Sequence, residues 1–194
     1  MMSSRVGVVR TVLLVALCAV ARSSSLHEAI ESNDGPRIST MLNTSDEKSR
    51  TLLLSTPDEN RLLPLHSAAW HGHLEALAAL IEGGAVLDTP SAEHGEMTAL
   101  HWATGQGHDD VVRRLLDAGS NMEATDSGGR TALHFAAARG YVSILRTLVS
   151  AGCALNALTA LNVTALNVTA LQMAAVALTM RSASSLCLSS VLIK

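Results

Sequence analysis

One string of residues recurs along this 194-residue chain at nearly constant spacing. Residues 131–137 read TALHFAA, residues 98–103 read TALHWA, and residues 64–70 read PLHSAAW. The histidines of the later two copies are 33 residues apart, and the earlier two are 35 residues apart. A unit this short cannot bury its apolar face alone and must stack on its neighbours. The recurrence therefore predicts a repeat array rather than a single globular core.

Each copy predicts a pair of short helices. The residue three positions before the histidine is placed to start the first helix, where Thr98 and Thr131 can act as caps and Leu63 cannot. Pro64 partly compensates in the earliest copy, because proline suits the first helical position. Apolar residues at helical spacing then predict the second helix. The glycines that are expected to end the first helices in the left-handed conformation are Gly72, Gly107 and Gly140.

These features resemble the ankyrin repeat, a β-turn followed by two helices with a Thr-Pro-Leu-His-x-Ala signature. The resemblance covers residues 58–157. It implies an all-α fold, a solenoid of helix-turn-helix units joined by short β-turn or hairpin loops. Three full repeats are expected, at about 58–88, 93–123 and 126–156, with degenerate repeats at both ends.

Composition agrees with a thin core of small side chains. Hydrophobic residues make up 48% of the chain but aromatic residues only 2%. The net charge of −3 gives no basic footprint for nucleic acid. If Cys18 is removed with the N-terminal segment, two cysteines remain, which define no disulfide framework. We expect Cys153 to be a small buried core residue.

Residues 1–21 are predicted to be a signal peptide. Arg5 and Arg10 supply positive charge, an apolar run follows, and residues 19–21 fit a small-x-small cleavage site. The alternatives are a mitochondrial transit peptide and an incorrectly assigned start. A genuine signal peptide would make the protein secreted or lumenal; otherwise it is expected in the cytoplasm.

The segments that flank the three repeats are less regular. Residues 22–57 are predicted to be a degenerate first repeat followed by an enlarged polar loop at about 43–55. Residues 158–180 hold a duplicated TALNV segment and an incomplete fourth repeat, and residues 181–194 are predicted to be a frayed tail. The charge-free stretch before Arg181 could suggest a membrane anchor, but interior amides oppose it, and no membrane partner is expected for the mature chain. A frameshift would also explain the amino-acid sequence of this C-terminal segment.

No residue pattern indicates catalysis, a cofactor or a metal. His66, His101 and His134 recur once per repeat, so the fold explains them, and in the family this imidazole bonds to the threonine and the neighbouring turn. The Asp109-Asp110 pair is expected to complement the start of a helix. The sequence therefore predicts a protein that is not an enzyme.

The predicted function is a non-catalytic scaffold that binds an unidentified partner protein, as a monomer and without nucleic acid. The alternative is a truncated fragment of a larger ankyrin-bearing enzyme or channel. In the family, partners lie across the concave surface formed by the turn tips and first helices. Carried over to this chain, those positions are Glu59, Asn60, Leu62, Trp70, His71, His94, Met97, Trp102, Gln106, Ser127, Arg130, Phe135 and Arg139.

Three Asn-x-Ser/Thr sequons are possible N-glycosylation sites, at Asn43, Asn162 and Asn167. The last two arise from the duplicated segment, so chance explains them as well. Asn43 is the best acceptor, because its surroundings are polar.

Overall fold

A computed structural model describes residues 22–153, so the expectations for residues 1–21, 158–180 and 181–194 lie outside the described part. The chain divides into two compact units, Met1–Val86 and Leu87–Lys194. Helices and turns make up the described residues of both units, and the only β-pairing found there is the isolated antiparallel bridge between Ser91 and Met97. The predicted all-α repeat class is confirmed.

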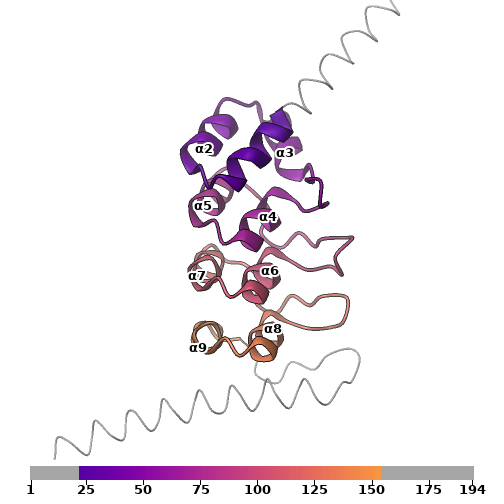
Figure 1. Cartoon of the computed structure of the whole chain (residues 1–194), viewed down its shortest axis with the longest axis vertical. Helices are drawn as coiled ribbons and strands as arrows, with labels where there is room; N and C mark the ends of the chain where they lie inside the picture. Colours follow the sequence, from indigo (N-terminus) through magenta and orange to yellow (C-terminus); the bar gives the residue numbers. More distant parts are fainter. Residues whose placement is uncertain (1–21, 154–194) are drawn as a thin grey trace, which may run out of the picture. The chain divides into compact units, whose positions relative to one another are not determined.

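The first unit contains a helix over residues 22–31 followed by α2 (Gly35–Asn43), α3 (Glu47–Ser55), α4 (Pro64–His71) and α5 (Leu74–Glu82). The helix α5 packs against both α2 and α4, and α3 contacts α4 (Figure 1). Side chains from these helices form the core, and each fully buried Leu or Ile stabilises the fold by about 1.5–3 kcal/mol. The largest buried residues here are Leu26, Ile30, Ile38, Leu42, Leu77 and Leu80.

The enlarged loop predicted for residues 43–55 is wrong, because residues 47–55 form α3. Asp46 caps this helix. The Asp46 carboxylate accepts two hydrogen bonds from Ser49, one from the backbone N–H at 3.4 Å and one from the side-chain hydroxyl at 2.6 Å. The bond from the Ser49 hydroxyl also lowers the pKa of Asp46. Leu53 is buried and anchors the helix. The N-cap, the buried Leu53 and the contact with α4 together favour a helix in this stretch.

The second unit contains two similar helix pairs, α6 (Ala99–Gln106) with α7 (Asp109–Asp117), and α8 (Ala132–Arg139) with α9 (Val142–Ser150). The first helices pack on each other, α6 on α8, and so do the second helices, α7 on α9. In Figure 1 the loops that precede α6 and α8 project on the side of these helices, away from α7 and α9. Small side chains allow the close approach of α6 and α8: Ala99, Ala103, Ala132 and Ala136 are fully buried.

The turns that open the three repeats explain their spacing. The backbone N–H groups of Asp58 and Asp126 donate to the carbonyl groups of Leu62 and Arg130, four residues on, both at 2.9 Å. In the middle repeat the equivalent bond joins residues 91 and 97, also at 2.9 Å, so this turn is two residues longer. The longer turn accounts for the 35-residue interval before His101.

The glycines predicted to end the first helices do so. Gly72, Gly107 and Gly140 are the C-caps of α4, α6 and α8, with φ angles of 75°, 86° and 71°. At Gly107 the space is also restricted, because an added Cβ would lie 2.9 Å from Cζ of Tyr141. This position therefore needs glycine for two independent reasons.

The two reasons can be separated by comparing Gly107→Ala with Gly119→Ala. Gly119 has a similar φ of 89° but nothing within 4 Å of an added Cβ. We expect Gly119→Ala to lower the free energy of unfolding by about 1–2 kcal/mol, the cost of a left-handed alanine. Gly107→Ala should cost measurably more, because the Tyr141 ring must also move. Urea denaturation checks this, and equal losses in the two variants would contradict it.

Candidate protein-binding surface

His101 connects the start of its own helix to the next repeat. Its Nδ1 accepts the backbone N–H of Thr98 at 3.1 Å and lies 2.9 Å from the Thr98 hydroxyl oxygen. Its Nε2 lies 3.0 Å from the backbone carbonyl oxygen of Arg130. Since Nδ1 accepts a hydrogen bond, the ring proton belongs on Nε2, which donates to that carbonyl. One buried imidazole therefore provides hydrogen-bond partners for backbone groups in two consecutive repeats.

The local half of this arrangement recurs where the sequence predicts it. His134 Nδ1 accepts the backbone N–H of Thr131 at 3.1 Å, and both threonines form capping boxes with their histidines. Leu63 makes no side-chain cap bond at the start of α4, where Pro64 occupies the first turn. The structural role predicted for these histidines is confirmed for His101 and His134.

Burial lowers the pKa of His101, because desolvation disfavours the imidazolium. The hydrogen bond to the Arg130 carbonyl and the negative charge of Asp126 act in the opposite direction but are weaker. The neutral ring is thus the form that fits the folded protein.

Asp126 organises the turn that leads into α8. Its carboxylate accepts the backbone N–H groups of Gly128 at 2.9 Å and Arg130 at 2.8 Å, and forms an ion pair with the Arg130 guanidinium at 2.6 Å. Burial alone would raise the pKa of Asp126, but the hydrogen bonds from Arg130 and Gly128 outweigh it, and the pKa is lowered. The turn is therefore held by a buried, ionised carboxylate.

Two predicted surface residues, Arg130 and Phe135, meet at this turn. The Arg130 guanidinium carbon lies 4.7 Å from the centre of the Phe135 ring, a cation–π arrangement. The Phe135 ring in turn lies edge-on to His101, with ring centres 5.5 Å apart. The backbone N–H of the exposed Ser127 donates to the carbonyl of Gly95 at 2.8 Å. The second unit thus presents an arginine that is positioned by its neighbours and still 45% exposed.

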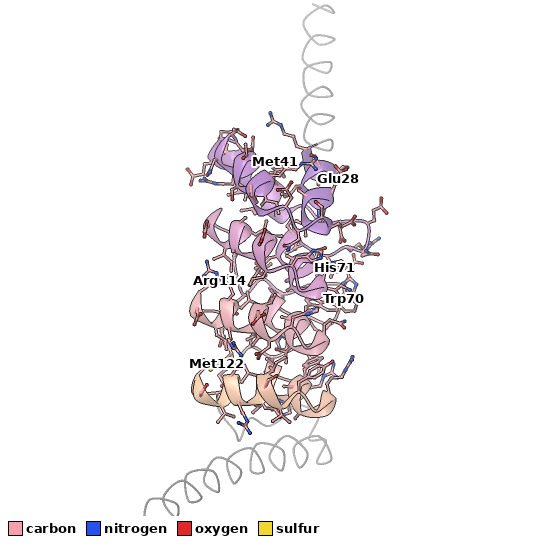
Figure 2. The ribbon with its side chains drawn as sticks, turned by 60° about the vertical axis from the view of Figure 1, so that its left-hand side comes forward. Glu28, Met41, Trp70, His71, Arg114 and Met122 are labelled. Carbon is pink, nitrogen blue, oxygen red and sulfur yellow. The ribbon has the colours of Figure 1, made fainter. Side chains whose placement is uncertain are left out.

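In the first unit, Trp70 and His71 lie at the C-terminal end of α4 (Figure 2). Trp70 is 38% exposed, which is high for so large an apolar side chain. His71 Nδ1 donates to the Ser67 carbonyl at 2.9 Å, and its ring stacks on His73 at 5.4 Å. His73 is fixed by a 2.6 Å bond from Nδ1 to the Ile30 carbonyl. These contacts orient the end of α4 and leave Trp70 accessible.

Two of the predicted surface residues are buried, which corrects the prediction. Leu62 is 6% exposed and Trp102 is 8% exposed, so neither can provide much contact area. Leu62 closes the turn begun by Asp58, and the Trp102 ring packs edge-on against His94 with centres 5.5 Å apart. The other predicted residues are accessible. The exposed ones are Glu59, Asn60, Trp70, His71, Ser127, Arg130 and Arg139, and the half-buried ones are His94, Met97, Gln106 and Phe135.

Other predicted features are placed as follows. Asp109 and Asp110 begin α7, and Asp109 pairs with Arg113 one turn later. Cys153 is buried, as expected, and burial raises the pKa of its thiol to about 12, with a further contribution from Glu123. Asn43 is exposed at the end of α2, and its glycosylation stays a prediction; Asn162 and Asn167 lie outside the described residues.

The residues that the structure describes offer no group of His, Cys, Asp and Glu suited to holding a metal ion. In the same part of the chain, no helix has the length and apolar character needed to cross a membrane.

The first unit contains an open cavity of about 790 Å³ that no sequence pattern predicted. It lies between the helix over residues 22–31, α3 and the turn at residues 58–60. It depends on α3, which was expected to be loop. The Asp46-x-x-Ser49 pattern is the signal that could have predicted this helix.

Comparison with known proteins agrees with the fold. Residues 65–159 match the family model for ankyrin repeats in three copies. Through this segment the chain belongs to the ankyrin repeat family, whose repeats are generally protein-interaction modules.

Relatives share the repeats, and the matched segment is only part of each of them. The chain is 35% identical over 97 residues to ankyrin repeat and SOCS box protein 2 of Bos taurus, which covers 50% of this chain and 14% of that protein. It is 34% identical over 90 residues to the human transient receptor potential cation channel subfamily A member 1, covering 46% and 8%. It is 32% identical over 82 residues to human protein phosphatase 1 regulatory subunit 27, covering 42% and 52%. The chain therefore spans about half of these relatives' length at most.

The role of His101 predicts a pH dependence of stability. Because its pKa is lowered from 6.5 on folding, its contribution is fully present above pH 6.5 and is lost as the pH falls through 6.5 towards the folded pKa. The free energy of unfolding should thus fall between pH 7 and pH 5, and fall less in His101→Gln. Urea denaturation at each pH measures both.

The control for overall destabilisation is Ile144→Val, a buried change that should cost about 0.5–1.5 kcal/mol and keep the wild-type pH dependence. Parallel pH profiles for wild type and His101→Gln would contradict the assignment.

Proposed function

We propose that this protein is a non-catalytic scaffold that binds a partner protein through the exposed turn tips and first helices of its ankyrin repeats. The observation that carries the proposal is that the Arg130 side chain is both fixed in place and exposed. Its guanidinium is held by Asp126 and Phe135 but remains 45% exposed. A side chain fixed before binding loses less conformational entropy in a complex. Arginine and aromatic residues also dominate binding hot spots.

The first unit supports the proposal through different residues. Trp70 is a large exposed apolar side chain at the end of a first helix, and Glu59 and Asn60 are exposed at the preceding turn. Tryptophan is among the residues that contribute most to interfaces, because it buries a large area with few rotatable bonds. Similarity to a protein named as a phosphatase regulatory subunit is consistent with a binding role.

The alternative is that these repeats belong to a larger ankyrin-bearing enzyme or channel. It is favoured by the names of two relatives, a cation channel and a palmitoyltransferase, of which the matched segments are 8% and 12%. Sequencing of the full transcript decides between the two. Coding sequence for further domains in frame with residues 1–194 would establish the alternative.

Affinity purification with the double variant Trp70→Ala, Arg139→Ala tests the proposed surface. Both side chains are exposed, so the fold should be retained. Tryptophan and arginine are the residue types that form hot spots, and a loss of more than about 1 kcal/mol for each should reduce partner recovery by about tenfold or more. The matched control is Val86→Ala, Arg146→Ala, which removes one exposed apolar residue and one exposed arginine outside the surface. Equal recovery of partners by both variants would rule the surface out.

A further inference from the structure

Gly105 is a helical glycine that the fold does not require. It lies inside α6, two residues before the left-handed Gly107 that ends the helix, and its own φ is not positive. The nearest atom to an added Cβ is Cδ1 of Phe135, at 3.7 Å, which is ordinary van der Waals contact. Alanine stabilises a helix more than glycine does, so neither backbone conformation nor space explains this residue. What the glycine provides is open space beside the Phe135 ring.

The corresponding positions of the other two repeats carry side chains. Trp70 and Ala138 also lie two residues before the glycine that ends a first helix, and both are exposed. The position can therefore hold a side chain as large as an indole. Only in the middle repeat does the chain leave this position without a side chain of its own.

The Phe135 ring is the apolar surface beside Gly105. The side chain is half-buried on α8. Its ring lies edge-on to His101 of α6, with ring centres 5.5 Å apart, and the guanidinium carbon of Arg130 lies 4.7 Å from its centre. A ring that is fixed by two other elements loses little conformational entropy when a partner binds. Aromatic rings prefer to pair with one another edge-to-face or offset-stacked, so a second ring suits this surface.

The Arg130 guanidinium decides which kind of side chain fits beside Phe135. Its Nε and Nη2 both donate to Oδ2 of Asp126, at 2.8 Å and 2.6 Å, and the Asp126 side chain is only 2% exposed. The charge of Arg130 is therefore already compensated by a buried carboxylate. A carboxylate from a partner would be repelled by Asp126 and gain little. An aromatic ring instead packs on the weakly hydrated guanidinium without displacing Asp126.

We propose that Gly105, Phe135 and Arg130 form a site for one aromatic side chain of the partner protein, called here the ring site. The partner's ring lies over Gly105, packs against Phe135 and contacts the exposed part of Arg130. Tryptophan fits best, because it has the largest ring and the strongest attraction for a cation. This inference rests on the proposed function and deepens it, because it names the side chain that the second unit recognises.

The test is a titration of the ¹⁵N-labelled full chain with the pentapeptide acetyl-Gly-Gly-Trp-Gly-Gly-amide, followed by backbone amide shifts and by the Nε–H signal of Arg130. We expect the largest shifts at Gly105, Phe135 and Arg130, because an indole ring beside them changes their local magnetic field. The same peptide with leucine or glutamate in place of tryptophan should bind at least fivefold more weakly.

The decisive variant is Gly105→Ala, which places a methyl group where the partner's ring would lie and changes no charge. It should weaken binding of the tryptophan peptide about fivefold. It should not lower the urea midpoint of unfolding, because alanine favours the helix. The matched control is Ala138→Ser, which adds one heavy atom at the corresponding exposed position of α8 and should leave peptide binding unchanged.

Four outcomes would each overturn the proposal: no shifts with the tryptophan peptide, equal binding of the leucine or glutamate peptide, a lower unfolding midpoint for Gly105→Ala, or equal binding by Gly105→Ala and Ala138→Ser. Neither Trp70 nor Arg139 belongs to the ring site. The affinity purification with Trp70→Ala, Arg139→Ala therefore tests the proposed surface independently, and failure of the ring site is distinguishable from failure of that surface.

Discussion

The second unit depends on the hydrogen bonds of one buried imidazole. A buried polar ring is costly unless its nitrogens have partners. His101 meets this requirement with the Thr98 N–H on one side and the Arg130 carbonyl on the other. The first bond starts α6, and the second fixes the turn that precedes α8. Thr131 and His134 repeat the first of these bonds 33 residues later, so the recurrence of this residue pair has a direct physical cause.

The proposed binding surface of the second unit is connected to this constraint. The carbonyl that His101 holds belongs to Arg130, whose guanidinium is fixed by Asp126 and lies over the Phe135 ring. The same turn is thus tied to the core through its backbone and presents a charged side chain to solvent. The hydrogen bonds of His101 therefore help to hold the turn that carries Arg130, and arginine is a residue type favoured at interfaces. In the first unit a different position is exposed, that of Trp70, on the helix that has no threonine cap.

Features set by local geometry could be predicted from the sequence, and features set by packing could not. The capping histidines, the left-handed glycines and the burial of Cys153 each depend on residues close in the chain or on a fixed position in the repeat. The burial of Leu62 and Trp102 depends on the direction in which packing turns each side chain, which spacing does not show. The cavity could not be predicted because its lining comes from two separate segments, residues 23–31 and 52–60, and the second of these includes part of α3, which was expected to be a polar loop.

The tautomer of His101 tests the central claim most directly. Long-range ¹H–¹⁵N correlation spectra at pH 7 distinguish the two ring nitrogens and show which of them carries the proton. The account predicts a neutral ring protonated at Nε2, with a proton that exchanges slowly because it is bonded to the Arg130 carbonyl. A ring protonated at Nδ1, or at both nitrogens at pH 7, would contradict it, since Nδ1 could then not accept the Thr98 N–H.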